Sequence, residues 1–404
     1  MREMKDSGTV WRKVPLNWNL VRIDSLYVLR NEKVSDRDYQ PLSVTKQGIL
    51  PQLETAAKTD AHDSRKLVKK GDFAINSRSD RRGSCGISEL DGSVSLINTV
   101  LKPRSNMNPR YYNWLFHTNE FGDEFYKWGH GIVDDLWTTN WQDMKVINIP
   151  EPPIKEQKVI ADFLDKKCSE IDALTKDIEK QIEVLEDYKK SVITEAVTKG
   201  LNPNVEMKES GIQWIGNCPK NWSIKKFKYV HNGANVGESI DKEYWSDDKS
   251  DFLFYTAGIN PINTTFKNFP DWKYINDNDL LLARNGTPYV YYPLKGAVYS
   301  DHIIRTKINE KYDKRFIRYS LMRSIDSVVV DSVSIATWSI SLWNTQTLPM
   351  PNLLEQKSIA DFLDEECKKI DETIFDKQKQ LEILAEYKKS LIYEYVTGKK
   401  EVIA

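Results

Sequence analysis

The sequence EQKVIADFLDKKCSEID, from Glu156 to Asp172, returns almost unchanged as EQKSIADFLDEECKKID, from Glu355 to Asp371. Beyond this stretch the two copies stay in register at a constant offset of 199 residues, as far as Thr198 and Thr397. About 25 of the 43 aligned positions are identical, which indicates an internal repeat. The repeated segment therefore decides the organisation of the whole chain.

A second, shorter echo supports the repeat, because MKDSGTVW, starting at Met4, matches MKESGIQW, starting at Met207. The stretches between the echoes, about 20–150 and 223–349, barely resemble each other. A scaffold was therefore kept twice while the two domains that it carries diverged. This arrangement is typical of a protein that reads two different things at a fixed distance.

Each copy of the repeat predicts a long amphipathic helix. Pro and Gly are absent between Ile154 and Thr198, and proline-containing segments precede both copies. Gly200 and Gly398 are natural stop signals at the far ends. Apolar residues recur every seven positions, as in a coiled-coil seam. In the first copy this row consists of Leu164, Ile171, Ile178, Leu185 and Val192.

The two helices have matching seams, so we expect them to pair within the chain as an antiparallel coiled coil. A whole globular domain lies between them in the sequence, which leaves room for the antiparallel direction. Lys377 interrupts the second seam where Ile178 lies in the first, which indicates imperfect packing or a partner contact. The alternative is two separate helices that mediate oligomerisation.

Length and composition favour a protein of two or three domains, and the net charge cannot distinguish a neutral soluble protein from one whose local basic patches are offset by acidic surface. The 404 residues exceed one ordinary domain, and the net charge of −1 shows no global basic field. The four cysteines have no zinc-ligand spacing, and Cys168 and Cys367, which are repeat counterparts, are expected to be buried. Neither a signal peptide nor a membrane span is apparent, so a cytoplasmic protein is expected.

Motifs for catalysis are also missing from the sequence. It has no GxxxxGK[ST] phosphate loop, no metal spacing among its five histidines and no recognisable nucleophile–base set. We therefore expect a recognition subunit and not an enzyme, with no metal or cofactor of its own.

The segments between the helices predict a mixed α/β (α+β) fold. Short apolar runs bounded by turn residues, such as GDFAIN and NDLLLARNG, read as strands. Each segment also has one expected amphipathic helix, NPRYYNWLFHTNEF or DKRFIRYSLMRSI, and a strand-like exit. The predicted domains are 1–150 (recognition domain 1), 151–200 (helix 1), 201–349 (linker and recognition domain 2) and 350–404 (helix 2).

Basic residues gather in the first recognition domain, and the loop SRSDRRGSCG follows an apolar strand. Arginine can donate two bonds to guanine, and this composition suits phosphate contacts and base-edge readout. The alternative is an ordinary solvated turn. The candidate DNA-binding residues here are Lys69, Lys70, Arg78, Arg81, Arg82 and Arg104, within a wider basic set that includes Arg65, Lys66, Lys102 and Arg110.

In the second recognition domain the corresponding loop is ARNGTPYVYYPLKG. Its candidate DNA-binding residues are Arg284, Asn285 and Lys295. Tyr291 and Tyr292 offer further contact area, or pack inside the domain instead.

The motifs PPIKEQKVIADFLD, from Pro152 to Asp165, and PNLLEQKSIADFLD, from Pro351 to Asp364, resemble the specificity subunits of type I restriction–modification systems. The resemblance covers the whole chain. It implies binding of double-stranded DNA at two short specific blocks separated by a fixed unspecific gap. It also implies two adenine methyltransferase subunits, which bind S-adenosylmethionine, and ATP-driven restriction subunits as partners.

Two other classes remain open at this point. The chain could be a coiled-coil interaction protein without DNA specificity, or an enzyme with an unrecognised site. A footprint with two protected base clusters would separate the first class from a DNA-specificity subunit, and turnover by the purified chain alone would reveal the second.

Overall fold

The computed structural model describes residues 2–52, 62–131, 137–249, 252–285, 287–330 and 337–402. The chain forms two compact units, which are treated separately below. Unit 1 comprises Met1–Ile178 and Gln378–Ala404, and unit 2 comprises Glu179–Lys377. The domain boundaries drawn from the sequence separate the helices from the globular segments, whereas the compact units divide both helices between them.

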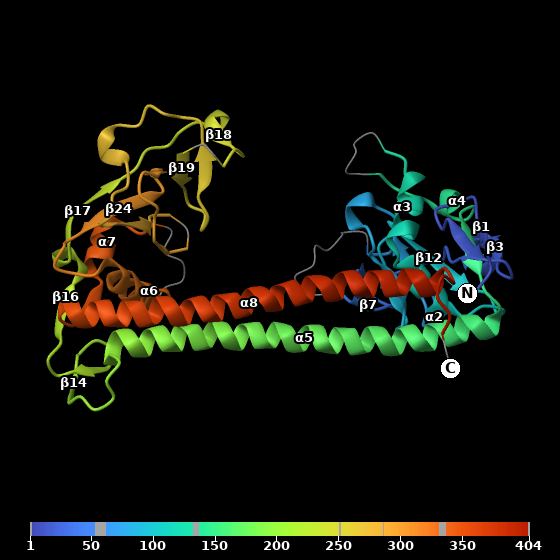
Figure 1. The fold of residues 1–404 in the computed structure, drawn as a ribbon. Helices are drawn as coiled ribbons and strands as arrows, with labels where there is room; N and C mark the ends of the chain where they lie inside the picture. Colours follow the sequence, from blue (N-terminus) through green and yellow to red (C-terminus); the bar gives the residue numbers. More distant parts are fainter. Residues whose placement is uncertain are drawn as a thin grey trace. The chain divides into compact units, whose positions relative to one another are not determined.

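The two predicted long helices are confirmed as α5 (Ile154–Lys199) and α8 (Leu353–Val396) (Figure 1). Both end where the sequence predicts. Gly200 and Gly398 have φ angles of +76° and +68°, a left-handed conformation that glycine adopts without steric cost and that terminates a helix.

In unit 1 the first part of α5 lies against the last part of α8. The rings of Phe163 and Tyr395 have centroids 4.4 Å apart, and Lys388 Nζ lies 2.5 Å from Asp172 Oδ1. As the residue number rises along one helix, the number of its partner falls along the other. The two helices are therefore antiparallel, as expected.

In unit 2 the remaining parts of the same helices pair in the same sense. Lys189 Nζ lies 2.6 Å from Asp371 Oδ1. Lys377, which interrupts the seam, donates to Gln181 Oε1, so a polar contact replaces the apolar one at this point. The expected pairing within the chain is thus confirmed.

Unit 1 is built from small antiparallel sheets and short helices. Its main sheet has the strand order β10-β9-β12-β4, and the other sheets are β11-β8-β5, β13-β3, β6-β7 and β1-β2. The strands are β1 (Met4–Asp6), β2 (Lys13–Pro15), β3 (Asn19–Arg22), β4 (Tyr27–Leu29), β5 (Lys33–Val34), β6 (Leu42–Thr45), β7 (Gly48–Pro51), β8 (Arg65–Val68), β9 (Phe73–Asn76), β10 (Cys85–Ile87), β11 (Gly92–Val94), β12 (Asn98–Pro103) and β13 (Asn148–Glu151). The short helices are α1 (Ile23–Leu26), η1 (Ser79–Arg81), α2 (Pro109–Phe116), α3 (Asn119–Lys127) and α4 (Trp141–Met144).

The single helix expected over NPRYYNWLFHTNEF is in fact two helices, α2 and α3. The break falls at His117 and Thr118. Thr118 adopts an extended conformation, and its hydroxyl accepts a hydrogen bond from Phe121 N at 3.2 Å, which caps α3. The cap formed by the Thr118 side chain therefore starts a new helix, although the apolar periodicity of the sequence runs on without a break.

The core of unit 1 joins its globular part to the helix pair. Tyr27, Phe73 and Phe116 form a fully or almost fully buried aromatic cluster between the main sheet and α2. The same cluster continues into Leu164 of α5 and Val396 of α8, both with no exposed surface. The apolar stripe of the helices is therefore covered by the domain as well as by the other helix.

Unit 2 repeats this plan with different strands. Its sheets have the orders β17-β24-β21-β22, β18-β20-β19-β23, β16-β25 and β14-β15, and β19 pairs with β23 in parallel. The strands are β14 (Met207–Glu209), β15 (Asn217–Pro219), β16 (Ser223–Lys226), β17 (His231–Val236), β18 (Trp245–Ser246), β19 (Phe252–Tyr255), β20 (Ile262–Thr264), β21 (Asp279–Ala283), β22 (Val290–Tyr291), β23 (Val298–Tyr299), β24 (Ile303–Ile308) and β25 (Thr347–Met350). The helices are η3 (Phe227–Tyr229), η4 (Lys242–Tyr244), η5 (Asp271–Lys273), α6 (Lys314–Val330) and α7 (Ile340–Thr345).

The short sequence echo has a structural role in both units. Trp11 follows β1 and donates from Nε1 to Asn148 O, at the start of the exit strand β13, over 2.9 Å. Trp214 follows β14 and donates from Nε1 to Thr347 O, at the start of the exit strand β25, over 3.2 Å. In each unit the echo thus fastens an N-terminal hairpin to the strand that leads into the long helix.

All four cysteines are free and buried, which confirms the expectation for Cys168 and Cys367. Burial raises the pKa of the Cys85 thiol to about 12, so it stays protonated. Within the described ranges, no three His, Cys, Asp or Glu side chains are grouped closely enough to hold a metal ion. The same part of the chain contains no helix that is long and apolar enough to cross a membrane.

Candidate nucleic-acid interface

The duplicated motif fastens each globular part to its own long helix. Gln157 is 2% exposed, and its Oε1 accepts a hydrogen bond from Asn108 N, the residue that caps α2, at 2.9 Å. Its Nε2 donates to Pro152 O at 2.8 Å. The carbonyl oxygen and the amino group of the buried Gln157 side chain thus both have hydrogen-bond partners. These bonds fix the start of α2 against the start of α5.

The second copy of the motif makes the same contacts in unit 2. Gln356 Oε1 accepts from Asp313 N at 2.9 Å, and its Nε2 donates to Pro351 O at 2.8 Å. The glutamine of the EQ pair is therefore a structural clamp in both units.

Two aspartates of the same motif hold an arginine of the recognition domain. Arg110 of α2 contacts both Asp162 and Asp165 of α5. In unit 2, Arg315 of α6 lies 2.8 Å from both Asp361 and Asp364 of α8. Hydrogen bonds to ionised carboxylates are stronger than neutral ones.

Two residues of the predicted basic set already have partners in the fold. Arg110 is exposed and contacts the two aspartates of α5. Arg65 is only 6% exposed and donates from Nε to Ser93 Oγ at 2.9 Å. The sequence alone does not show which cations meet a partner inside the fold.

We expect loss of the glutamine clamp to destabilise its unit. Gln356→Ala would leave Asp313 N and Pro351 O without their partners, at a cost of about 1–3 kcal/mol for each buried polar group. Urea unfolding followed by circular dichroism measures this loss. The matched control is Gln380→Ala, on the exposed face of the same helix, which should change stability by less than about 0.5 kcal/mol. Equal effects of the two changes would argue against the clamp.

A polar cleft of about 710 Å³ opens in unit 1 beside the loop that follows β9. Two of the predicted DNA-binding residues, Arg78 and Arg81, line it. The other polar side chains of the cleft lie on β6, β8, β9, η1, β12 and the adjoining loops; they are Ser43, Thr45, Lys46, Gln52, Arg65, Asn76, Asp80, Ser84, Ser95 and Asn98. Hydrogen-bond donors and acceptors of this kind read base edges in a DNA groove.

Asp80 orients both arginines of the cleft. Its Oδ1 lies 2.9 Å from Arg78 Nε, and its Oδ2 lies 3.7 Å from Arg81 Nε. Two guanidinium groups share one carboxylate, so these three residues together carry an excess positive charge. The side chain of Arg81 is 67% exposed and that of Arg78 is 37% exposed, and both therefore stay accessible to a ligand.

Asn98 also lines the cleft but exposes little surface. It is 4% exposed, and its Nδ2 donates to Ser95 O at 3.0 Å. Its Oδ1 has no hydrogen-bond partner among the described residues and almost no accessible surface, so it does not present a free acceptor to a ligand in this conformation.

The sequence did not single out Asn76, Asn98, Gln52 or Lys46. Asn76, Asn98 and Gln52 are amides, which add nothing to a cluster of charges, and Lys46 stands apart from the basic clusters in the sequence. The position of Asn76 at the end of a buried strand, directly before the Arg-rich loop, is the one local feature that could have drawn attention to it.

The remaining predicted residues of unit 1 lie away from this cleft. Arg82 turns toward α3, where it contacts Asp123 and lies 5.9 Å from the ring centroid of Tyr126. Lys69 and Lys70 are exposed on the turn after β8, and Lys70 Nζ lies 3.3 Å from Glu89 Oε2. Arg104 is exposed just after β12 and reaches Asp24 O over 3.4 Å.

In unit 2, Arg284 and Asn285 follow β21, as Arg78 follows β9 in unit 1. Arg284 donates to Asp301 O at 3.1 Å, and Asn285 Nδ2 lies 2.8 Å from His302 Nδ1. These contacts fix the loop after β21 to the turn before β24. Lys295 is not part of this group, since it pairs with Asp277 over 2.7 Å on an exposed surface.

Of the two tyrosines in this loop, one packs inside the domain and the other offers contact area at the surface. Tyr291 packs inside and is 3% exposed, whereas Tyr292 is 46% exposed. The loops of the two units are thus unlike in composition and in contacts, although each follows a buried strand of its main sheet.

Comparison with known proteins gives a consistent result. A sequence profile described as the type I restriction modification DNA specificity domain matches residues 15–184. The specificity subunit of the type I restriction enzyme MjaVIII of Methanocaldococcus jannaschii is 26% identical, over 96% of this chain and 94% of its own. The putative type I restriction enzyme MjaX specificity subunit of the same organism is 29% identical, over 75% of this chain and 71% of its own.

Residues 15–184 match the type I restriction modification DNA specificity domain, and nearly the whole chain is similar to the specificity subunit of a type I restriction enzyme. The resemblance noted in the sequence is therefore confirmed, and with it the role in DNA sequence recognition at the level of the family. The relatives are named as specificity subunits, in agreement with the expected non-catalytic role.

Solved structures support the fold of this chain. A chain from a study of complex assembly and conformational transition in the type I R-M system matches with a TM-score of 0.74, at 12% identity, over 96% of this chain and 99% of its own. The HsdS subunit of Thermoanaerobacter tengcongensis matches with a TM-score of 0.52, at 14% identity, over 96% of this chain and 98% of its own. At such identities the likeness concerns the fold alone, and it confirms the mixed α/β architecture with two long helices.

Proposed function

We propose that this specificity subunit reads a bipartite, asymmetric site on double-stranded DNA, with one block of bases read by each globular part. The observation that carries this proposal is the duplicated clamp. Gln157 with Asp162 and Asp165, and Gln356 with Asp361 and Asp364, hold two domains by the same contacts. The loops that the clamps support are unlike, so two identical attachments present two different reading surfaces.

The chemistry of the unit 1 cleft supports base reading. Arg78 and Arg81 line the cleft and can each donate two hydrogen bonds to guanine. The exposed Lys69, Lys70 and Arg104 outside the cleft suit phosphate contacts, which position a protein on DNA without reading its sequence. In unit 2, Arg284 and Asn285 are the corresponding candidates, and Lys295 is a candidate for a phosphate contact.

We further propose that the subunit directs adenine methylation and restriction by partner subunits in the cytoplasm. Two methyltransferase subunits would supply the methyl transfer and bind S-adenosylmethionine, and restriction subunits would supply ATP-driven cleavage. The specificity subunit itself would contribute DNA binding and the geometry between the two blocks.

The test is methylation-sensitive long-read sequencing of a host that carries this subunit together with its methyltransferase. We expect methylated adenines in one asymmetric motif of two short blocks with a fixed gap. Deleting the gene for the specificity subunit should abolish this motif. A continuous or palindromic motif would contradict the proposal.

A purified preparation of the chain alone should not methylate DNA, and activity should appear on adding the methyltransferase subunits. Transfer of labelled methyl groups from S-adenosylmethionine to DNA measures this directly. Methylation by the partner-free chain would overturn the assignment of catalysis to the partners.

A further inference from the structure

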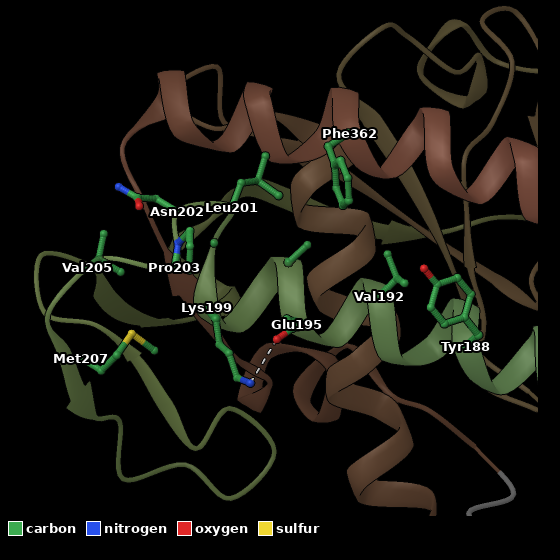
Figure 2. Close-up of a pocket in the computed structure, with 12 residues that line it drawn as sticks. Tyr188, Val192, Glu195, Lys199, Leu201, Asn202, Pro203, Val205, Met207 and Phe362 are labelled. Carbon is green, nitrogen blue, oxygen red and sulfur yellow. Dashed lines mark hydrogen bonds and ion pairs between the residues drawn. The ribbon is translucent and has the colours of Figure 1, made fainter.

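A cavity of about 800 Å³ lies in unit 2, where the end of α5 and the following linker face α8 (Figure 2). Its walls include Val192 of α5, Leu201 of the linker and Phe362 of α8. The described residues of the loop after β21 are not among its lining residues. The cavity therefore belongs to the attachment of the domain to its helix, and it does not include the candidate base readers of unit 2.

The loop after β21 in unit 2 has the same backbone connections as the loop after β9 in unit 1. In unit 2, Trp338 N donates to Arg284 O over 2.6 Å. In unit 1, Thr139 N donates to Ser77 O over 2.9 Å. Thr139 and Trp338 are 199 residues apart, and each directly precedes the residue that caps the next helix. Arg284 therefore holds the backbone place of Ser77.

The next residue of each loop is a candidate base reader. In unit 1, Arg78 forms an isolated antiparallel bridge with Thr138. In unit 2, Asn285 forms the same kind of bridge with Thr337, and the two threonines are again 199 residues apart. Asn285 therefore stands where Arg78 stands, although the two side chains differ in charge and in length.

A third matched contact places His302 beside this residue. In unit 2, Arg284 N donates to His302 O over 2.8 Å. The counterpart in unit 1 runs from Ser77 N to Ile97 O over 3.3 Å, and Ile97 lines the polar cleft. Unit 2 thus has an imidazole where unit 1 has an apolar side chain.

His302 holds the side-chain amide of Asn285. Asn285 Nδ2 lies 2.8 Å from His302 Nδ1. Because an amide nitrogen only donates, Nδ1 accepts this bond and the ring carries its proton on Nε2. In unit 1 the carboxylate of Asp80 orients Arg78 in a similar way, with 2.9 Å between Oδ1 and Nε. The side chain of His302 is 46% exposed and Asn285 is partly exposed, so a ligand can reach the pair.

The held amide still offers one donor and one acceptor to a ligand. One hydrogen of Asn285 Nδ2 is directed to His302, which leaves the second hydrogen and Oδ1 available. At the major-groove edge, adenine presents a donor at N6 and an acceptor at N7, and an asparagine amide matches both. Guanine presents two acceptors, O6 and N7, so one of them would face Oδ1 without a hydrogen. The amide therefore favours adenine, whereas an arginine favours guanine.

We propose that Asn285 reads one adenine of the second DNA block, and that His302 is a positioning residue that fixes the direction of the Asn285 amide. The inference rests on the proposed function, since it takes double-stranded DNA as the ligand, and it adds the base and the residues that select it. One backbone place thus carries a side chain suited to guanine in unit 1 and a side chain suited to adenine in unit 2.

The first test gives unit 2 the residue of unit 1 in the full-length chain, assembled with its methyltransferase subunits. Binding to DNA sites changed at one position at a time gives the base preference. Asn285→Arg should change the preferred base at one position of the second block from adenine to guanine, by about ten-fold or more, and leave the first block unchanged. Asn285→Asp keeps the size of the side chain but lacks the donor, and it should lower the preference for adenine at that position about ten-fold or more.

The matched control for these variants is Lys295→Ala. Lys295 pairs with Asp277 outside the group around Asn285, so its loss should keep the base preference at every position. Unchanged base preference of both Asn285 variants, or a loss spread equally over all positions of the block, would overturn the adenine assignment.

The second test separates orientation from packing at His302. His302→Leu has a similar size but no acceptor, so it should relax the same single position about ten-fold or more. His302→Asn places a carbonyl oxygen where Nδ1 lies and should restore most of the preference. Equal behaviour of the two variants, or relaxation at other positions, would overturn the positioning role.

The wild-type complex separates failure of this inference from failure of the proposed function. A wild-type site without a second block of bases would contradict the proposed function. A bipartite site whose second block keeps its base preference in the Asn285 variants would contradict the adenine assignment alone.

Discussion

The double variant Arg78→Ala/Arg81→Ala is expected to lose discrimination of the first DNA block. Both arginines line the polar cleft of unit 1 and are oriented by Asp80. A base-reading arginine contributes about 1–3 kcal/mol, so removing two lowers affinity for the target roughly 30-fold or more. The measurement is DNA binding by the reconstituted methyltransferase complex at a fixed salt concentration.

The pattern of loss distinguishes the two possible roles of these residues. Base readers would relax particular positions of the first block, whereas phosphate contacts would weaken binding to all sequences and reduce its salt dependence. The matched control is Arg82→Ala, because Arg82 is adjacent in sequence but faces Asp123 of α3. Arg284→Ala should affect only the second block. If the double variant bound target DNA with the same affinity as the wild type, Arg78 and Arg81 would not take part in DNA binding.

A chain truncated after Asn202 is expected to form a symmetric dimer. The truncation removes the end of α8, including Leu391, Ile392 and Val396, from the core of unit 1. Tyr111 also loses the carbonyl of Val396, to which its hydroxyl donates at 2.7 Å. Exposing one Leu- or Ile-sized side chain costs about 1.5–3 kcal/mol, so the fragment is driven to cover this surface.

The end of α5 is a repeat copy of the removed segment. Val192, Ile193 and Val197 correspond to Leu391, Ile392 and Val396, so the α5 helix of a second fragment can replace α8. The resulting dimer has two-fold symmetry, and two identical readers should select an inverted repeat of the first DNA block. Light scattering measures the dimer, and selection from random DNA measures the symmetry of the site.

Ile193→Asp/Val197→Asp in the fragment is the control, since it places charges where the apolar contacts would form and should leave a monomer. A soluble monomer without these changes would contradict the helix-pair explanation. A dimer without preference for an inverted repeat would keep the helix pair but contradict the assignment of one block to each domain.

The long helices and their pairing were predictable because the signals are local and repeated. Seven-residue spacing of apolar side chains, and glycines at both far ends, define α5 and α8 within a few residues. Matching seams then favour one antiparallel partner. The break between α2 and α3 was missed, because a single threonine cap outweighed an apolar pattern that runs through it.

The lining of the candidate cleft was predictable only in part. The Arg-rich loop after a buried strand indicated Arg78, Arg81 and Arg82; the first two line the cleft and Arg82 faces α3, and the role of all three in DNA binding stays a prediction. Arg110 and Arg65 meet partners that lie far away in the sequence. Net charge and loop composition do not reveal such partners, and an uncharged residue outside these loops, such as Asn98, adds nothing to a cluster of charges.

The sequence by itself determined that one scaffold occurs twice and carries two unlike domains. The repeat can be recognised from identical residues at a constant offset, which requires no information about contacts. Only the tertiary structure decided what the repeated residues do. Gln157 and Asp165 hold a recognition domain through hydrogen bonds to residues about fifty positions away in the sequence. Long-range contacts depend on which distant segments lie side by side in the folded chain. The local periodicity of the sequence does not contain this information.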